Sequence, residues 1–364
     1  MQSQLPIAVV GDGLAGTAAV QALLADGRQV LWYAPGAAGS SQAAAGLLNP
    51  VSGKFLTLAQ PIGPLLQAMR AWRFWPGSWA ARHHIQYGSV YRPYRDAQQA
   101  KAWGKRLSQS AYQPFLREQS GPFLPIVLHN PLGGLWVRPA AAVNIPELLK
   151  AIQADLFQRL KLTHIPQPLD PHQLNPENLE VPVACGCQRV QAVVFAGGWP
   201  DHRNPFWTVP MLKPVKGQLL ELEAPDLTLP APVSGPVYVI SKGGNRFVLG
   251  ATFERGISTP EVDTPGRDYL LQRWAELFPQ HAQPTVLDQR AGIRTQTPDR
   301  KPVVGPHPEH PALWFINGLG SKGLLYAPLL AQELVRGLKA QQACAALKLQ
   351  PEVALGRFAE LRPQ

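Results

Sequence analysis

Short apolar runs alternate with glycine-rich and polar segments in the first 35 residues. Ile7-Ala8-Val9-Val10 and Val30-Leu31-Trp32-Tyr33 are apolar runs of the length and composition of buried parallel strands. Residues 17–25 between them favour a helix that ends at Asp26-Gly27. A strand, a turn, a helix and a second strand within about thirty residues predict a βαβ unit.

Further along the chain, helical patterns and strand patterns occupy different regions. Helices are expected near 65–74 and 96–108 and within 140–162. Apolar runs predict strands at 192–196, 218–222, 237–240, 246–249 and 313–317, and a last helix over 326–338. The fold class predicted is α/β, a Rossmann-like domain with an interleaved antiparallel-sheet domain.

Length and composition indicate a well-packed protein of about two domains. The chain has 364 residues, 45% of them hydrophobic and 16% charged, which argues against disorder. The three cysteines, Cys185, Cys187 and Cys344, match neither a zinc motif nor a disulfide framework, so a reducing cytoplasm is expected. The apolar start lacks the basic region of a signal peptide, and no apolar stretch reaches the ~18 residues of a membrane helix, so no membrane is required.

The formal net charge of +10 permits two interpretations. A basic protein attracts nucleic acid or another anionic partner, and it also attracts the phosphates of a cofactor. Lys and Arg are scattered along the chain without a long basic run, which favours the second interpretation. His83-His84 has no third ligand nearby in sequence, so no metal site is expected.

The turn after the first strand carries a dinucleotide-binding pattern. Gly11, Gly13 and Gly16 form GxGxxG, in which the glycines make the turn, admit a pyrophosphate and let helix pack on strand. Backbone N–H groups at Leu14 and Ala15 would face the phosphates at the helix N-terminus. An acidic residue that binds ribose usually ends the second strand, but Ala34 stands there, which disfavours NAD.

Five motifs, in order along nearly the whole chain, resemble those of the FAD-dependent D-amino acid oxidase superfamily, which includes glycine and sarcosine oxidases. The motifs are the GxGxxG turn, the small-residue segment 39–46, the strand and turn 193–199, the strands around 214–218 and 238–252, and the closing segments 292–305 and 318–328. The resemblance implies non-covalent FAD, since no cysteine lies in 317–323. Beyond the five positions of the turn, it assigns FAD contacts to Ser40, Ser41, Ala44, Ala45, Gly46, Ala196, Gly197, Gly198, Trp199, Gly318, Gly320, Ser321, Lys322, Gly323 and Leu324.

Arg294 is the candidate substrate ligand, because a guanidinium pairs with a carboxylate through two hydrogen bonds. The family's Gly-x-Arg motif implies the same role, and Arg290 is the competing candidate. Tyr238 is expected either to line the substrate cavity or to pack in the core. No general base is required if a neutral amine gives hydride from its α-carbon to flavin N5 and the imine then hydrolyses.

Three functions remain open from the sequence. The first is an enzyme that oxidises the C–N bond of a small amino acid or secondary amine. The second follows from 317–324, which resembles the oxidase domain of the bifunctional enzymes that act on carboxymethylaminomethyl-uridine in tRNA. Its best candidate for a basic RNA-binding face is Arg92, Arg95, Lys101, Lys105 and Arg106. The third is a flavin-binding protein without turnover.

The predicted domains are discontinuous. Residues 1–60, 140–210 and 285–364 form the FAD-binding domain, and 61–139 and 211–284 form the substrate domain. The tryptophan-rich stretch from Trp72 to Trp79 either caps the pocket or packs in the core, and core packing is the preferred interpretation.

Overall fold

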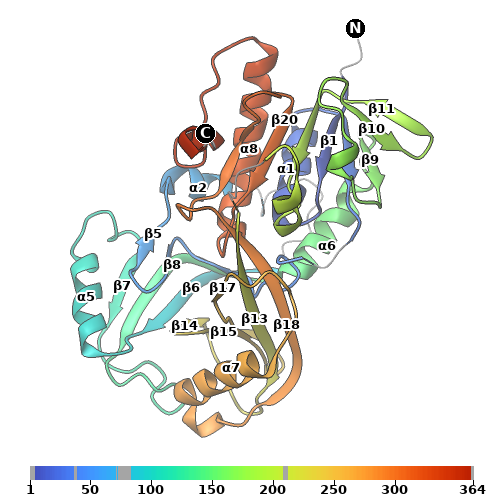
Figure 1. Ribbon diagram of the computed structural model, residues 1–364. Coiled ribbons are helices and arrows are strands. Elements are labelled where there is room, and N and C mark those ends of the chain that lie inside the picture. The colour runs from blue at the N-terminus through green and yellow to red at the C-terminus, as the bar shows by residue number, and fades with distance from the viewer. Residues whose placement is uncertain (1–4, 37–38, 71, 73–82, 208–211, 362–364) are drawn as a thin grey trace.

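Two β-sheets, one mainly parallel and one mainly antiparallel, form the framework of the protein (Figure 1). The computed structural model describes residues 5–36, 39–70, 72, 83–207 and 212–361. The parallel sheet and its helices occupy one end of the molecule, and the antiparallel sheet occupies the other. The α/β fold expected from the sequence is therefore confirmed.

The first sheet places the βαβ unit at its centre. Among the described residues it has six strands in the order β19-β20-β12-β1-β2-β9, and all neighbours are parallel except β19 and β20. Its strands are β1 (Ile7–Val10), β2 (Val30–Tyr33), β9 (Leu162–Ile165), β12 (Ala192–Phe195), β19 (Val303–Pro306) and β20 (Leu313–Asn317). The central strands are buried on both faces, which explains their continuous apolar runs.

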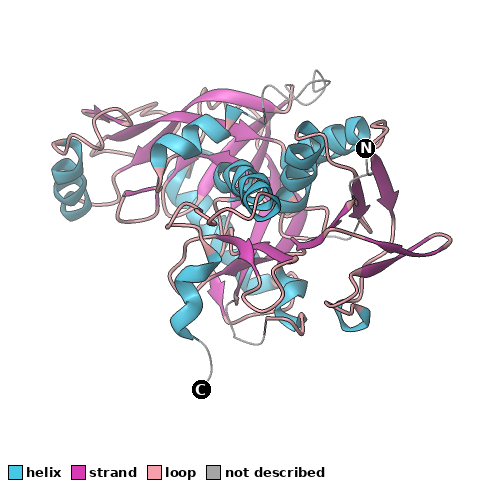
Figure 2. Ribbon diagram, turned by 90° about the horizontal axis from the view of Figure 1, so that it is seen from above, coloured by secondary structure: helices cyan, strands magenta, loops and turns pink. Residues whose placement is uncertain are grey.

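Helices cover one face of this sheet. α1 (Leu14–Ala25) and α8 (Gly323–Gln342) lie side by side, with α2 (Ile62–Ala68) against α8 and α6 (Ile145–Leu156) against α1 (Figure 2). The expectation of a helix from about residue 140 was wrong at its start, because β8 continues to Val143. Pro146 occupies the first turn of α6, where a missing N–H costs nothing.

The second sheet carries the longest strands. Among the described residues it has ten strands: β3 (Leu47–Leu48), β6 (Ile85–Pro93), β7 (Leu116–Gln119), β8 (Gly134–Val143), β13 (Lys213–Glu223), β14 (Val233–Ser234), β15 (Tyr238–Gly243), β16 (Arg246–Gly250), β17 (Glu254–Arg255) and β18 (Thr285–Gln296). α7 (Thr264–Leu277) packs on it through Leu270 and Trp274, and α5 (Ala97–Leu107) packs beside β7. Two hairpins, β4–β5 (Val51–Ser52, Thr57–Leu58) and β10–β11 (Glu180–Val183, Gly186–Arg189), lie outside both sheets.

β13 and β18 bring the two parts of the chain together. They pair antiparallel from Lys213↔Gln296 to Glu223↔Thr285. One face of β18 contacts the small-residue segment, because a Cβ on Gly292 would lie 3.0 Å from Ser40 Cα and 2.9 Å from Ala43 Cβ. The division of the chain into two domains at the residues given above stays a prediction.

Candidate functional site

The glycine turn is built as the dinucleotide-binding pattern requires. Gly11 has φ +112°, and a Cβ there would lie 2.5 Å from the Ala196 carbonyl oxygen. A Cβ on Gly16 would collide with the Gly11 carbonyl. Both glycines are therefore fixed by close backbone contact, which leaves the turn tight enough for a pyrophosphate to approach its N–H groups.

The start of α1 suits an anion. Its first turn holds no acidic residue, and its N-cap residue Gly13 offers no side chain. The Leu14 N–H donates to Ser41 Oγ at 3.2 Å, which joins the small-residue segment to the turn. The segment 39–46 therefore lies beside the glycine turn, where a bound cofactor is expected to pass.

The usual acidic position at the end of β2 is occupied by Ala34, which is buried. The carboxylate at this strand end comes instead from the turn after β1, because the Gly36 N–H donates to Asp12 Oδ2 at 2.7 Å. The sequence did not single out Asp12, because only the folded chain brings its carboxylate to the end of β2.

A buried carboxyl group organises the turn after β12. The Gly197 N–H and the Asn317 side-chain amide donate to Asp201 Oδ2 at 2.9 and 2.8 Å. Burial raises the pKa of Asp201 to about 7, although those hydrogen bonds lower it. Asp201 thus joins the Gly197-Gly198-Trp199 turn to the end of β20, a link that the spacing of these residues does not reveal.

The start of α8 lies against the start of α1. A Cβ on Gly323 would lie 2.8 Å from Leu14 Cδ1, and the Gly320 N–H donates to the Thr295 carbonyl at 2.9 Å. Lys322 precedes the helix without a side-chain cap, and burial lowers its pKa. The structure therefore brings together every predicted cofactor segment, and their residues fit a dinucleotide with a flavin ring.

Arg294 and Tyr238 meet on one face of the antiparallel sheet. Burial raises the pKa of Tyr238, and the charge of Arg294 and its hydrogen bond to the hydroxyl oppose that rise. Arg294 Nη1 also donates to the Thr252 carbonyl at 3.3 Å. A Cβ on Gly217 would collide with the guanidinium, so this glycine provides the space in which Arg294 lies.

The opposite face of β13 holds a network of charged and polar side chains. Buried Lys216 pairs with Asp263 and with Glu254, the latter at 3.5 Å. Burial disfavours the charge of Lys216, but the two carboxylates raise its pKa overall. Gln218 donates to Glu254 at 3.0 Å and to Asp263 at 2.9 Å. This network fixes the strand beneath the Arg294 face.

Arg290 competes poorly as the substrate ligand. It lies two residues before Gly292 on the same face of β18, but it pairs with Asp288 at 3.1 Å and with Glu221 at 3.6 Å. It also lines a cavity of about 170 Å³ that includes Ala44, Ala45, His83 and His84. Within the described residues no group of three His, Cys, Asp or Glu side chains could hold a metal.

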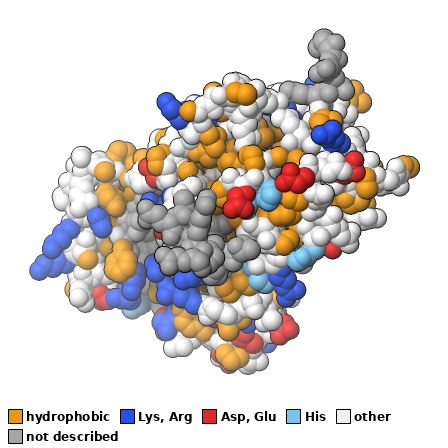
Figure 3. All heavy atoms as spheres, turned by 45° about the horizontal axis from the view of Figure 1, so that its top comes forward, with side chains coloured by type: hydrophobic (Ala, Val, Ile, Leu, Met, Phe, Trp, Pro, Cys, Tyr) orange, Lys and Arg blue, Asp and Glu red, His pale blue; other side chains and the backbone are white. Residues whose placement is uncertain are grey.

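The expected basic face is only partly at the surface. Arg92 is buried, stacks 4.8 Å from the Trp103 ring and donates to the carbonyls of Val51 and Gly53, so including it was wrong. Arg95 pairs with Asp96. In Figure 3, Lys and Arg side chains gather mainly toward one side of the face that is shown.

Trp72 is buried and donates to the Leu324 carbonyl at 2.8 Å, as core packing requires, whereas Trp75 and Trp79 lie outside the described residues.

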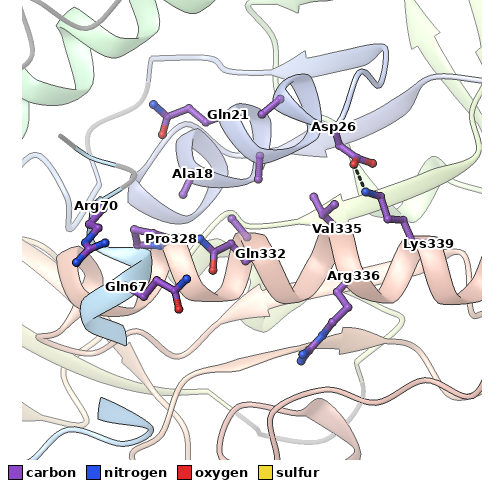
Figure 4. A pocket seen from close by; sticks show the side chains of 13 residues that line it. Ala18, Gln21, Asp26, Gln67, Arg70, Pro328, Gln332, Val335, Arg336 and Lys339 are labelled. Atoms are coloured by element: carbon purple, nitrogen blue, oxygen red, sulfur yellow. Dashed lines mark ion pairs between the residues drawn. The ribbon is translucent and has the colours of Figure 1, made fainter. Parts of the chain in front are cut away.

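A larger cavity lies between α1, α2 and α8 (Figure 4). Its volume is about 830 Å³, and Gln21, Arg70, Gln332 and the Asp26–Lys339 ion pair line it. None of the predicted cofactor residues borders this cavity. The cavity runs along α1 and α8, beyond the N-terminal turns of both helices.

Comparison with known proteins agrees with this geometry. The family model described as FAD dependent oxidoreductase matches residues 6–336. The chain belongs to this family. It is therefore an enzyme of the FAD-dependent oxidoreductase class, with FAD as its cofactor. No helix in the described parts of the chain is long and apolar enough to cross a membrane.

Relatives of two kinds match this chain over most of its length. The chain is 27% identical over 356 residues to glycine oxidase of Geobacillus kaustophilus, covering 90% of this chain and 91% of that protein. It is also 27% identical over 361 residues to the tRNA 5-methylaminomethyl-2-thiouridine biosynthesis bifunctional protein MnmC of Caulobacter sp., covering 97% of this chain. The chain spans 57% of that bifunctional protein, and a 36% identical match in Marinobacter nauticus spans 25% of its protein.

Solved structures show the same fold. Glycine oxidase from Geobacillus kaustophilus superposes with a TM-score of 0.81 at 22% identity, over 95% of this chain and 96% of that one. Iminodiacetate oxidase from Chelativorans sp. superposes with a TM-score of 0.74 at 20% identity, over 95% and 97% of the two chains.

Proposed function

We propose that this flavoenzyme oxidises the C–N bond of an amine that carries a carboxylate, such as an amino acid or an N-substituted glycine. The observation that carries the proposal is the pairing of Arg294 with Tyr238 on the sheet face that contacts Ser40 and Ala43. A fixed cation and a phenol hydroxyl suit a substrate carboxylate. Their closeness to the small-residue segment suits oxidation at the adjacent carbon.

The residues of the chain would bind and orient the substrate. Arg294 holds the carboxylate through its guanidinium fork, and Tyr238 donates its hydroxyl hydrogen to the same group. Held by the glycine turn and the segments that adjoin it, FAD would supply the acceptor for the hydride of the substrate α-carbon, and water would hydrolyse the imine product. The N–H groups before α8 and the helix dipole favour negative charge at that end of the site.

A second candidate substrate is carboxymethylaminomethyl-uridine in tRNA. The match to the Caulobacter bifunctional protein over 97% of this chain favours it, because that protein is named for the biosynthesis of a modified uridine in tRNA. A carboxymethylamino group would present the same carboxylate to Arg294. The third hypothesis, a flavin-binding protein without turnover, is not supported, because the chain belongs to the FAD-dependent oxidoreductase family.

The deciding experiment is the visible spectrum of the purified protein under anaerobic conditions, with glycine, sarcosine, and D- and L-amino acids added in turn. Loss of the oxidised flavin absorbance with one of them supports the small-molecule function. Flavin that only modified tRNA reduces supports the second candidate. RNA binding should then weaken steeply as the salt concentration rises. Flavin that no amine reduces contradicts the proposed function.

A further inference from the structure

Phe253 is an exposed aromatic side chain on the same sheet face as Arg294. Phe253 directly precedes β17, in which Glu254 pairs with Lys216 and Arg255 with Val215 of β13. The Arg294 guanidinium carbon lies 5.9 Å from the centre of the Phe253 ring, and that of Arg255 lies 5.6 Å from it. The residue Phe253 is 49% exposed. A lone exposed phenylalanine is common, but this one borders the carboxylate site.

The backbone on both sides of Phe253 is anchored. Thr252 is buried, and its hydroxyl oxygen accepts the Gln218 N–H at 2.9 Å. Glu254 accepts from the Gln218 side chain at 3.0 Å and pairs with Lys216 at 3.5 Å. Because side chains alternate along an extended chain, these anchors hold Phe253 on the Arg294 face. The backbone position of Phe253 is therefore fixed, while about half of the residue's surface stays exposed.

We propose that Phe253 and Arg255 form a subsite for a planar ring carried on the amine nitrogen of the substrate. The inference rests on the proposed function, in which Arg294 holds the carboxylate. A ring on the amine substituent would stack on Phe253, and Arg255 would lie at its outer edge. Glycine and sarcosine leave this subsite empty. The substrate class is thus an N-arylmethyl or N-heteroarylmethyl glycine, either a small molecule or a nucleobase within RNA.

The test compares flavin reduction rates of the holoenzyme, Phe253→Ala and Phe253→Leu with sarcosine and with N-benzylglycine. We expect Phe253→Ala to lower kcat/KM for N-benzylglycine about tenfold and to leave sarcosine within about twofold, since stacking on an aromatic ring is lost only for the larger substrate. Phe253→Leu keeps apolar bulk and should lose part of this preference. Phe55→Ala is the matched control, because Phe55 is 67% exposed on the β4–β5 hairpin.

The source of the ring is separated by 5-carboxymethylaminomethyl-uridine, given as the nucleoside and within an RNA stem-loop. Faster reduction by the stem-loop, lost at high salt, identifies RNA. Equal rates for the nucleoside and N-benzylglycine identify a small molecule. Equal losses for sarcosine and N-benzylglycine in Phe253→Ala, or no loss, overturn the subsite and leave the proposed function standing. If no substrate reduces the flavin, both proposals fail.

Discussion

The guanidinium of Arg294 lies across the backbone of Gly217, where any side chain would overlap it. Arg294 belongs to β18 and Gly217 to the neighbouring β13, in which Val215 is the register partner of Arg294. The missing side chain lets Arg294 extend over β13 to the Thr252 carbonyl, 3.3 Å from Nη1. The position of the candidate carboxylate ligand is thus set by a glycine on another strand.

Gly217→Ala should displace Arg294 and leave the cofactor site intact. Misplacement of an orienting group by about 1 Å costs on the order of 100-fold in rate, so we expect a loss of that size in kcat/KM for the amine substrate. The flavin content, measured from visible absorbance, should stay that of the wild type. Gly88→Ala is the control, because a Cβ at Gly88 on β6 meets no atom within 4 Å. Wild-type kinetics in Gly217→Ala would contradict the role of this contact.

Arg294→Lys keeps the positive charge and removes the two-pronged hydrogen bonding. We expect a 10- to 100-fold weaker binding of carboxylates, roughly the contribution of one hydrogen bond to a charged group. Titration of the flavin spectrum with a carboxylate inhibitor measures this affinity directly. Arg290→Lys tests the competing candidate, and a larger loss in that variant would reverse the assignment.

Gly16→Ala should weaken FAD binding strongly. The added methyl group would collide with the Gly11 carbonyl, so the start of α1 must move away from β1, at a cost of about 1–3 kcal/mol. The measurement is the ratio of flavin to protein after purification. In Gly63→Ala, an alanine replaces a glycine of α2 that has open space around it, and this variant should keep its flavin. Full flavin content in Gly16→Ala would contradict the assigned turn.

The local patterns of the sequence predicted four strands of the first sheet, β1, β2, β12 and β20, because strands buried on both faces must be apolar along their length. The patterns did not predict β9 and β19, which are the outer strands of this sheet. α7 gave no such signal, since Pro265 and Gly266 stand at its start and its buried positions include only Leu270, Trp274 and Leu277 among large apolar residues. The pairing of Asp12 with Gly36 and the contact of Arg294 with Gly217 join residues on different elements. Such contacts depend on strand order and register, which local periodicity does not encode.

Asp201 should make the stability of the protein depend on pH. Burial raises the pKa of its carboxyl group from 3.8 to about 7 in the folded state. Between about pH 4 and pH 7 the folded protein therefore retains a proton that the unfolded chain has already lost. The free energy of unfolding falls as pH rises through this range. Each unit of pKa difference corresponds to about 1.4 kcal/mol, which makes the effect measurable.

Asp201→Asn removes this titration and keeps an oxygen that can accept from the Gly197 N–H and the Asn317 amide. Urea unfolding of both proteins at pH 5, 6, 7 and 8 should show the wild type losing stability relative to the variant up to about pH 7, with a constant difference above it. Parallel pH profiles would mean that the carboxylate is already ionised at pH 5 in the folded protein. Its two hydrogen bonds would then outweigh the cost of burying the charge, and the turn after β12 would hold an anion near the flavin segment.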